Sequence, residues 1–226
     1  MINVSATPEW RAAHPGAAIG LLELSGVVNT SPSAELNQRK RETEARLRSH
    51  YAGYSRQDFL ALPVMAAYEK YYRHFDKTYH VLLQVESIVL KSRNLPDVSP
   101  LVDANFTAEV SSLVLTAGHD GAKLEQPVVM DVSHLGDEMV NMYGEHKPIR
   151  PGDMVMRDPH GICCTILYGQ DNRSPISAQT RDVLYVTYAP AGVPQDQIQS
   201  HLRQIEEYVR LFAPLAAVEQ NCLLIA

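Results

Sequence analysis

The chain has few cysteines, and their spacing excludes two common uses of that residue. Only three occur in 226 residues, and two of them, Cys163 and Cys164, are adjacent. A disulfide framework needs more cysteines, and a zinc-binding pair needs a spacer of about two residues. We therefore expect Cys163, Cys164 and Cys222 to be buried as small apolar side chains.

The sequence also lacks a long apolar run. No stretch reaches the roughly 18 consecutive apolar residues of a membrane-spanning helix, so we expect no membrane contact. The opening segment, MINVSATPEWRAAHPG, lacks the charged and then apolar regions of a secretory signal. Together these absences predict a cytoplasmic protein.

Positive charge is not in excess. Lys and Arg total 20 against 26 Asp and Glu, which gives a net charge of −6 at pH 7. Because a protein that grips a long nucleic-acid backbone presents a basic face, any RNA contact here should involve a short end or loop. The densest basic segment comprises Arg39, Lys40, Arg41, Arg46 and Arg48. It fits either a local RNA-binding patch or a solvated helix face with pairs such as Glu44–Arg48.

Several motifs of catalysis and cofactor binding are missing. The sequence contains no GxxxxGK(S/T), GxGxxG, GxSxG or HExxH pattern. Ser111 and Ser112 precede His119 and Asp120, but proximity in sequence does not build a catalytic triad. We expect no metal, no cofactor and no aminoacylation by this chain alone, because a synthetase needs an ATP-handling motif.

The most informative stretch is LPDVSPLVDANFTAEVSSLVLTAGHD, residues 95 to 120. Pro96 and Pro100 predict a short extended segment, because each disfavours helix in the residue before it. Closely spaced polar residues follow, then a helix near Ala108 and a turn from Gly118 to Gly121. This pattern fits a pocket wall, and it equally fits an ordinary loop-to-helix connection with an N-cap.

Hydrophobic periodicity predicts the other elements. Helices are expected at 34–50 after the N-cap Ser33, from Ser55 onward, and from 193 onward, while 78–93 fits either a helix or a strand. Strands are expected at 17–28, 127–132, 139–142, 153–156, 162–168 and 183–188. Short strands beside a helical front part predict an α+β fold with flanking helices. We take residues 1–226 as one domain, with a helical front part at 1–94 and a second part at 95–226.

Aromatic residues concentrate in one segment: Tyr68, Tyr71, Tyr72, Phe75, Tyr79 and His80. Such a cluster can stack nucleobases, and it can equally pack in a core. The aromatic segment or the last helix also offers a surface for a homodimer.

The segment LPDVSPLVDAN resembles the LP-x-(I/V)-x-P-LVD-x-x-N signature of B3/B4 domain proteins. These are stand-alone relatives of the B3/B4 module in the β subunit of bacterial phenylalanyl-tRNA synthetase. The resemblance continues through Gly118 and through the runs GDMVMRDPHGICC and SAQTRDVLYVTY. It implies a layered fold with a β-sandwich of unusual topology, and recognition of the aminoacyl end of a tRNA.

In the synthetase, this module hydrolyses tyrosine that has been wrongly attached to tRNA. Here Arg173, Ser174 and Pro175 occupy the loop that resembles the region of the module's acidic editing residue. The resemblance therefore implies either hydrolysis of a misacylated tRNA in trans or binding without turnover. A third interpretation is a non-enzymatic pocket for a free amino acid or a similar small metabolite.

Polar side chains that could line such a pocket occur in three segments. The candidates are Asp103, Asn105, Thr107 and Ser112, then His119 and Asp120, and finally Arg157, Asp158, Asn172, Arg173 and Thr180. Mixed donors and acceptors beside an apolar wall suit a small zwitterion or an aminoacyl ester, since Arg binds carboxylates and Asp binds ammonium groups. The alternative for each residue is a turn in which its side chain bonds to nearby backbone. The pattern does not single out a catalytic residue.

Overall fold

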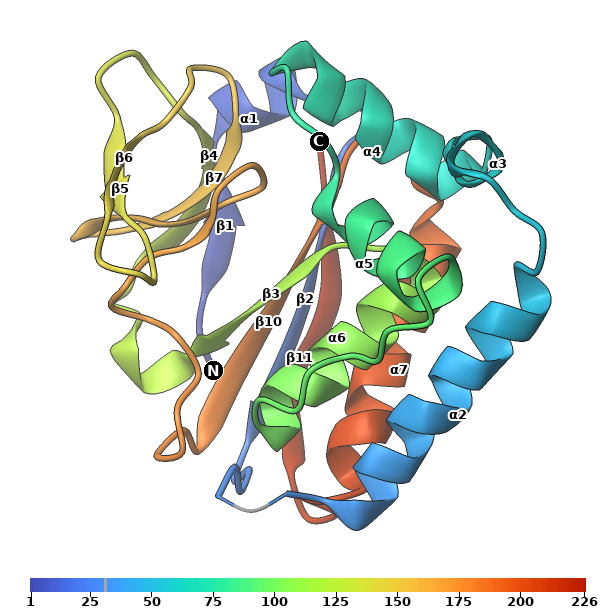
Figure 1. Ribbon diagram of the computed structural model, residues 1–226. Helices are drawn as coiled ribbons and strands as arrows, with labels where there is room; N and C mark the ends of the chain where they lie inside the picture. The colour runs from blue at the N-terminus through green and yellow to red at the C-terminus, as the bar shows by residue number, and fades with distance from the viewer. Residues whose placement is uncertain (31) are drawn as a thin grey trace.

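The computed structural model describes residues 1–30 and 32–226, and it shows the predicted α+β fold, built in layers (Figure 1). The first sheet contains, in order, β1 (Val4–Ala6), β4 (Val128–Val132), β7 (Met154–Asp158), β8 (Gly161–Thr165) and β9 (Gly169–Gln170). The second contains β11 (Ala217–Ile225), β2 (Ala18–Ser25), β10 (Asp182–Ala189) and β3 (Thr116–Asp120). β5 (Glu138–Val140) and β6 (His146–Pro148) form a hairpin of their own. All these pairings are antiparallel except that of β1 with β4.

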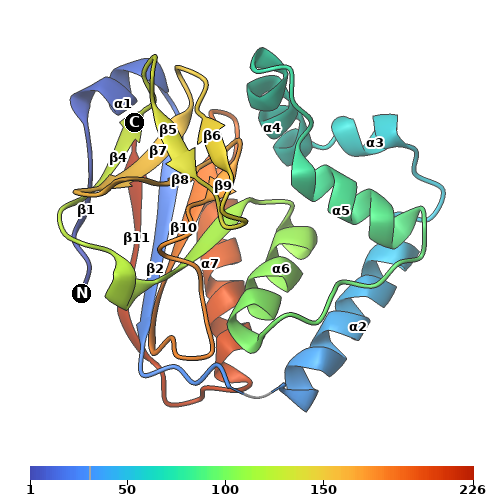
Figure 2. The same cartoon turned by 60° about the vertical axis from the view of Figure 1, so that its left-hand side comes forward.

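Helices cover the second sheet on the side away from the first sheet (Figure 2). α6 (Pro100–Ser112) and α7 (Gln195–Arg210) lie on this face, and α2 (Ala34–His50) packs on α6. α3 (Arg56–Leu60), α4 (Pro63–His74) and α5 (His80–Val89) follow α2 in the chain. α1 (Pro8–Ala13) packs instead against β4 of the first sheet, and a short 3-10 turn, η1 (Gly121–Lys123), follows β3. Leu22 and Leu24 of β2 pack with α6 and α7 in one buried cluster. Ile19 and Leu21 point the other way, into a larger cluster that includes the first sheet. Because both faces of β2 are buried, its sequence is mostly apolar, as expected for a central strand. Its one buried charged residue, Glu23, accepts a hydrogen bond from Ile2 N.

The helix predicted at 34–50 is present as α2, but part of the basic segment expected at its surface is buried. Lys40 is fully buried, and its Nζ lies 2.6 Å from Asp97 Oδ1, 2.9 Å from Asp103 Oδ2 and 2.8 Å from the Pro96 carbonyl oxygen. Glu44 is also buried, and it accepts a hydrogen bond from Leu95 N. The polar stripe of α2 therefore anchors the segment that leads into α6.

The predicted turn at Gly118–Gly121 is also wrong, because Gly118, His119 and Asp120 belong to β3 and pair with β10. Gly118 is needed for close packing rather than for a turn. A Cβ there would lie 2.7 Å from Ile176 Cδ1 and 2.9 Å from Tyr185 Cε1. Helix α6 also begins earlier than predicted, at Pro100, which suits the first position of a helix.

Two further differences concern the end of the chain and the cysteines. Strand β11 was not predicted, because its sequence, AVEQNCLLI, lacks a clear alternation and its side chains are mostly exposed or half-buried. Cys163 and Cys164 are buried as predicted, whereas Cys222, which lies on β11, is exposed. Among the described residues, no helix is both long and apolar enough to cross a membrane.

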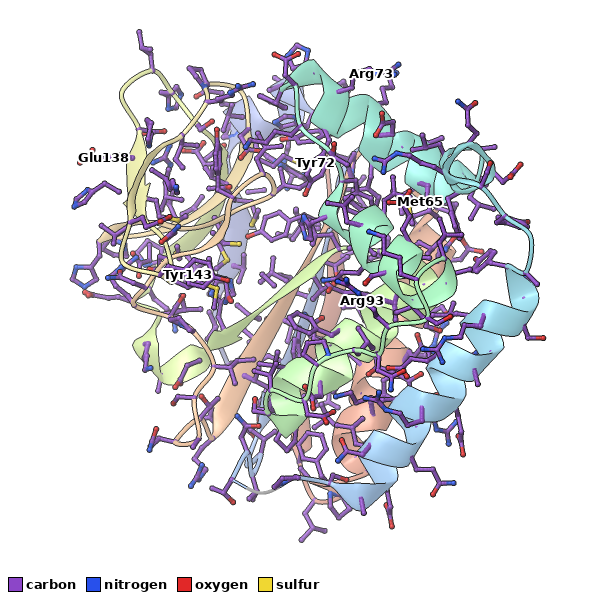
Figure 3. All side chains as sticks on the ribbon, viewed as in Figure 1. Met65, Tyr72, Arg73, Arg93, Glu138 and Tyr143 are labelled. Atoms are coloured by element: carbon purple, nitrogen blue, oxygen red, sulfur yellow. The ribbon has the colours of Figure 1, made fainter. Side chains whose placement is uncertain are left out.

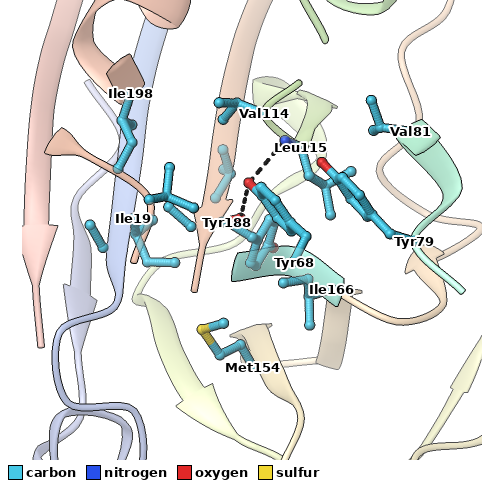
Figure 4. Close-up of a cluster of buried hydrophobic side chains, with 14 of the residues drawn as sticks. Ile19, Tyr68, Tyr79, Val81, Val114, Leu115, Met154, Ile166, Tyr188 and Ile198 are labelled. Carbon is cyan, nitrogen blue, oxygen red and sulfur yellow. Dashed lines mark hydrogen bonds between the residues drawn. The ribbon is translucent and has the colours of Figure 1, made fainter. Parts of the chain in front are cut away.

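The aromatic segment packs in the core. Tyr68, Tyr72 and Tyr79 are at most 1% exposed. The Tyr68 and Tyr79 rings stack with centroids 4.2 Å apart. The Tyr68 hydroxyl donates to the Tyr188 carbonyl and accepts from Leu115 N, which ties α4 to the second sheet (Figure 4). These rings are therefore not available to stack on nucleobases.

Replacement of Lys40 tests the buried ion pair. We expect Lys40→Met to lower the free energy of unfolding by about 3–5 kcal/mol, because it leaves the buried Asp103 carboxylate without its cation. Urea unfolding at pH 7 measures the change. The matched control is Lys91→Met at an exposed position, where we expect less than about 0.5 kcal/mol. Equal stability of the two variants would contradict this role for Lys40.

Candidate functional site

A cavity of about 470 Å³ lies between helices α5 and α6 and strands of both sheets. Most of its wall is apolar, with contributions from Val102, Phe106, Leu115, Ile166 and Ile176. Small-molecule sites typically combine such a wall with a few convergent polar groups. Here the polar groups come from α5, α6, β8, β9 and β10, so segments far apart in the sequence meet at this place.

The backbone of Thr116, at the start of β3, fixes two polar side chains of α6. Asn105 Nδ2 donates to the Thr116 carbonyl oxygen at 2.9 Å, and Glu109 Oε1 accepts from Thr116 N at 2.8 Å. Asn105 and Glu109 are four residues apart, so they lie on one face of the helix. Both line the cavity, and both are at most 4% exposed.

Burial changes the charge of Glu109. It raises the pKa of the Glu109 carboxyl to about 8, against a usual value of 4.5. The carboxyl group is therefore mostly protonated at pH 7. Because Oε1 accepts the hydrogen bond from Thr116, the proton is best placed on Oε2. Glu109 then offers a hydrogen-bond donor, as a neutral carboxylic acid can in an apolar site.

Three buried polar atoms in the cavity wall have no hydrogen-bond partner among the described residues: Asn105 Oδ1, Gln84 Oε1 and the Tyr188 hydroxyl oxygen. The orientation of Asn105 is unambiguous, because only its nitrogen can donate to the Thr116 carbonyl. A buried polar group without a partner costs roughly 1–3 kcal/mol. These atoms can therefore form hydrogen bonds with a molecule that enters the cavity.

His80 adds a neutral imidazole to the wall. Burial lowers the pKa of His80 to about 4. The Tyr72 hydroxyl donates to the Ile166 carbonyl oxygen at 2.5 Å and lies 3.2 Å from His80 Nδ1. Since the Tyr72 hydrogen is already used, His80 Nδ1 carries the hydrogen and donates. The lone pair of the imidazole is therefore on Nε2.

Other cavities have similar volumes, with about 400 Å³ between α6 and α7, about 430 Å³ beside the N-termini of α2 and α6, and about 500 Å³ beside α4. The cavity beside α4 contains one unpaired buried atom, His14 Nε2. The cavity at Asn105 combines three such atoms with a protonated carboxyl group, so it is the best candidate for a binding site.

Three candidates of α6 lie outside this cavity. Asp103 pairs with Lys40. The Thr107 hydroxyl donates within the helix, to the Asp103 carbonyl at 2.6 Å. Ser112 Oγ lies 2.7 Å from His201 Nδ1 and joins α6 to α7. Asp103 and Ser112 line other cavities, and none of the three lines the cavity at Asn105.

His119, Asp158 and Arg173 belong to a second network, which adjoins the cavity through Gln170, whose Nε2 lies 3.3 Å from His119 Nδ1. His119 Nδ1 lies 2.7 Å from Ser174 Oγ, which donates to Asp171 Oδ1 at 2.6 Å. Arg173 pairs with Asp171 at 2.8 Å and with Asp158 through two bonds of 3.0 and 3.1 Å. Burial lowers the pKa of His119 to about 3, so its imidazole is neutral. The network closes the loop that follows β9.

The remaining candidates are dispersed. Thr180 donates to Asp120 at 2.9 Å, and Arg157 pairs with Asp131 at 2.9 Å. Asn172 lies beside a smaller cavity of about 230 Å³. Of all the candidates, Asn105 is the one that lines the candidate cavity of about 470 Å³.

The sequence analysis missed most of the polar groups that line the cavity: His80, Gln84, Glu109, Gln170 and Tyr188. Glu109 had a usable signal, because it follows Asn105 by four residues on an expected helix. The others belong to segments whose approach to α6 depends on the tertiary fold.

Comparison with known proteins gives a structural likeness but no match in sequence. No family model matches the chain, and no curated protein matches it. Among solved structures, the chain is similar to an N-terminal fragment of the phenylalanyl-tRNA synthetase β-subunit from Pyrococcus horikoshii. The TM-score is 0.48 and the sequence identity is 7%, over 97% of this chain and 54% of that chain. This chain thus spans about half the length of the fragment.

The raised pKa of Glu109 predicts a pH-dependent stability. The unfolded chain ionises this group above about pH 4.5, whereas the folded protein keeps it protonated up to about pH 8. Folding therefore becomes less favourable as pH rises between these values. Glu109→Gln retains the acceptor for Thr116 N and removes the ionisation. We expect this variant to gain roughly 2–3 kcal/mol relative to wild type between pH 4.5 and pH 7.

Urea unfolding of both proteins at several pH values measures this difference. The control is Glu207→Gln at an exposed position, for which we expect no such gain. If the difference between Glu109→Gln and wild type stayed constant with pH, Glu109 would be ionised in the folded protein.

Proposed function

We propose that this chain is a stand-alone relative of the B3/B4 editing module and that its cavity receives the aminoacyl group of a charged tRNA. The observation that carries the proposal is the set of unpaired polar atoms at Asn105, Gln84 and Tyr188, which line a mostly apolar cavity of about 470 Å³. Asn105 is also the last residue of the LPDVSPLVDAN segment. The resemblance in sequence and the unpaired acceptor thus coincide at one residue.

The charge of the wall favours an ester over a free amino acid. The lining residues among those described are apolar, neutral or acidic. A free amino acid would bring a carboxylate into this cavity without a counter-charge, which is costly. An aminoacyl ester has no carboxylate, and its ammonium group can donate to Asn105 Oδ1. The protonated Glu109 can donate to a carbonyl or hydroxyl oxygen of the same ligand.

The proposed activity is binding of the charged tRNA, and hydrolysis in trans would be a second activity of the same cavity. An aminoacyl ester is already activated, so hydrolysis needs a positioned water and a proton acceptor. His80 Nε2 offers a lone pair in the cavity wall. With a pKa of about 4, however, His80 is a weak base at pH 7. Turnover would therefore be slow.

A specific observation favours a second candidate, which is a pocket for a small metabolite without tRNA. The basic residues of α2 are engaged within the protein. Lys40 is buried against two aspartates, Arg46 donates to Ser111, and Arg48 donates to the Ile88 and Arg93 carbonyls. This helix therefore offers little free positive charge for an RNA backbone.

A binding and release assay tests the proposal. The purified protein is incubated with Tyr-tRNA(Phe), with a panel of other mischarged tRNAs and with their correctly charged partners. Filter retention measures binding, and release of labelled amino acid measures hydrolysis. We expect retention of at least one charged tRNA, and we expect Asn105→Ala to weaken it by roughly tenfold through the loss of one buried hydrogen bond.

The matched control is Asn172→Ala, because this candidate lies outside the cavity, and we expect its binding to equal that of wild type. Binding of a free amino acid or another metabolite, without retention of any charged tRNA, would favour the second candidate. Equal loss in the Asn105 and Asn172 variants would contradict the assignment of the cavity.

A further inference from the structure

An exposed aromatic side chain lies at the mouth of the candidate cavity. Tyr143 is 80% exposed and its neighbour Met142 is 51% exposed, yet both contribute to the cavity lining. They lie in the turn between β5 and β6, on the side of the molecule formed by the sheets (Figure 3). The solvent-exposed apolar surface of such a ring, next to a cavity, can be covered by a ligand that extends out of the cavity.

The turn that carries Tyr143 is held by several hydrogen bonds. Asn141 is only 7% exposed, and its Oδ1 accepts from Tyr143 N and Glu145 N, both at 3.0 Å. Gly144 N donates to the Asn141 carbonyl at 2.8 Å. These hydrogen bonds hold the turn in place. None of them involves the Tyr143 side chain, so its exposed ring is not needed to form the turn.

The same turn is attached to the cavity. Met142 N donates to the Gln170 carbonyl oxygen at 3.2 Å, and Gln170 itself lines the cavity. An isolated bridge joins Asn141 to Asp171. These contacts fix the turn relative to the wall, so a ligand that fills the cavity and extends outward would pass Tyr143.

We propose that Tyr143 forms a stacking subsite for a nucleobase that is linked to the group in the cavity. This inference rests on the proposed function, in which the aminoacyl group is attached to the terminal nucleoside of a tRNA. A tyrosine ring stacks on the face of any base, and such a contact needs no basic residue. The subsite would therefore let an acidic protein hold the end of a tRNA while leaving the rest of the tRNA largely uncontacted.

The size of the exposed patch favours a nucleobase over a protein partner. Met142 and Tyr143 are two adjacent side chains, whereas a stable protein interface covers roughly 800 Å² on each partner. A single base covers one aromatic ring. The patch also adjoins the cavity, so one ligand can occupy both.

Two probes separate the subsite from the cavity. Tyrosine N-methylamide occupies the cavity only, and 3′-deoxy-3′-tyrosylamino-adenosine adds the nucleoside through a stable amide. We expect the wild-type protein to bind the adenosine compound roughly 5- to 100-fold more tightly than the methylamide. We expect Tyr143→Ala to remove this advantage while changing the affinity for the methylamide less than twofold. Isothermal titration calorimetry measures all four affinities.

Two further variants complete the design. Tyr143→Trp should retain the tighter binding of the adenosine compound, because it keeps an aromatic face. Leu135→Ala removes an exposed apolar side chain in another loop and should change neither affinity. Thermal unfolding checks that each variant is folded, and we expect little change since Tyr143 is largely exposed.

The outcomes distinguish the subsite from the proposed function. If the wild-type protein bound both probes equally, or if Tyr143→Ala weakened both equally, the stacking subsite would be wrong although the cavity still bound its ligand. If neither probe bound the wild-type protein, both the occupancy of the cavity by a tyrosyl group and the subsite that depends on it would be overturned.

Discussion

The two hydrogen bonds that the Thr116 backbone makes with α6 are the constraint on which the candidate site depends. They fix Asn105 and Glu109 on one face of the helix and hold that face against β3. The same contacts leave Asn105 Oδ1 unpaired and keep the Glu109 carboxyl in an apolar environment that favours its protonated form. Packing of the helix and chemistry of the cavity thus have one common cause.

Helix α2, in the N-terminal part of the chain, helps to position α6. Lys40 of α2 holds the segment before α6 through Asp97, Asp103 and the Pro96 carbonyl. Buried ion pairs of this kind add little net stability, yet each partner becomes hard to replace alone. The positive charges of α2 are therefore better explained by folding than by RNA binding.

The candidate site is made of groups that are neutral at pH 7. Burial suppresses the charge of His80 and Glu109 alike, so binding there depends on hydrogen bonds and apolar contact rather than on ion pairs. Selectivity in such a cavity comes mainly from buried groups that a wrong ligand leaves unpaired. This physical character is the basis of the proposed preference for an esterified amino acid over a free one.

Local sequence patterns predicted the α+β class, most helices and strands, and the burial of Cys163 and Cys164. These features follow from local periodicity and from proline and capping residues, which act over a few positions. The tertiary structure decided that Gly118 lies in a strand, that Lys40 is buried, and that Glu109, His80 and Tyr188 share a cavity. These contacts depend on which distant segments pack together. The local pattern around a polar residue does not show which residue far away in the sequence will be its partner.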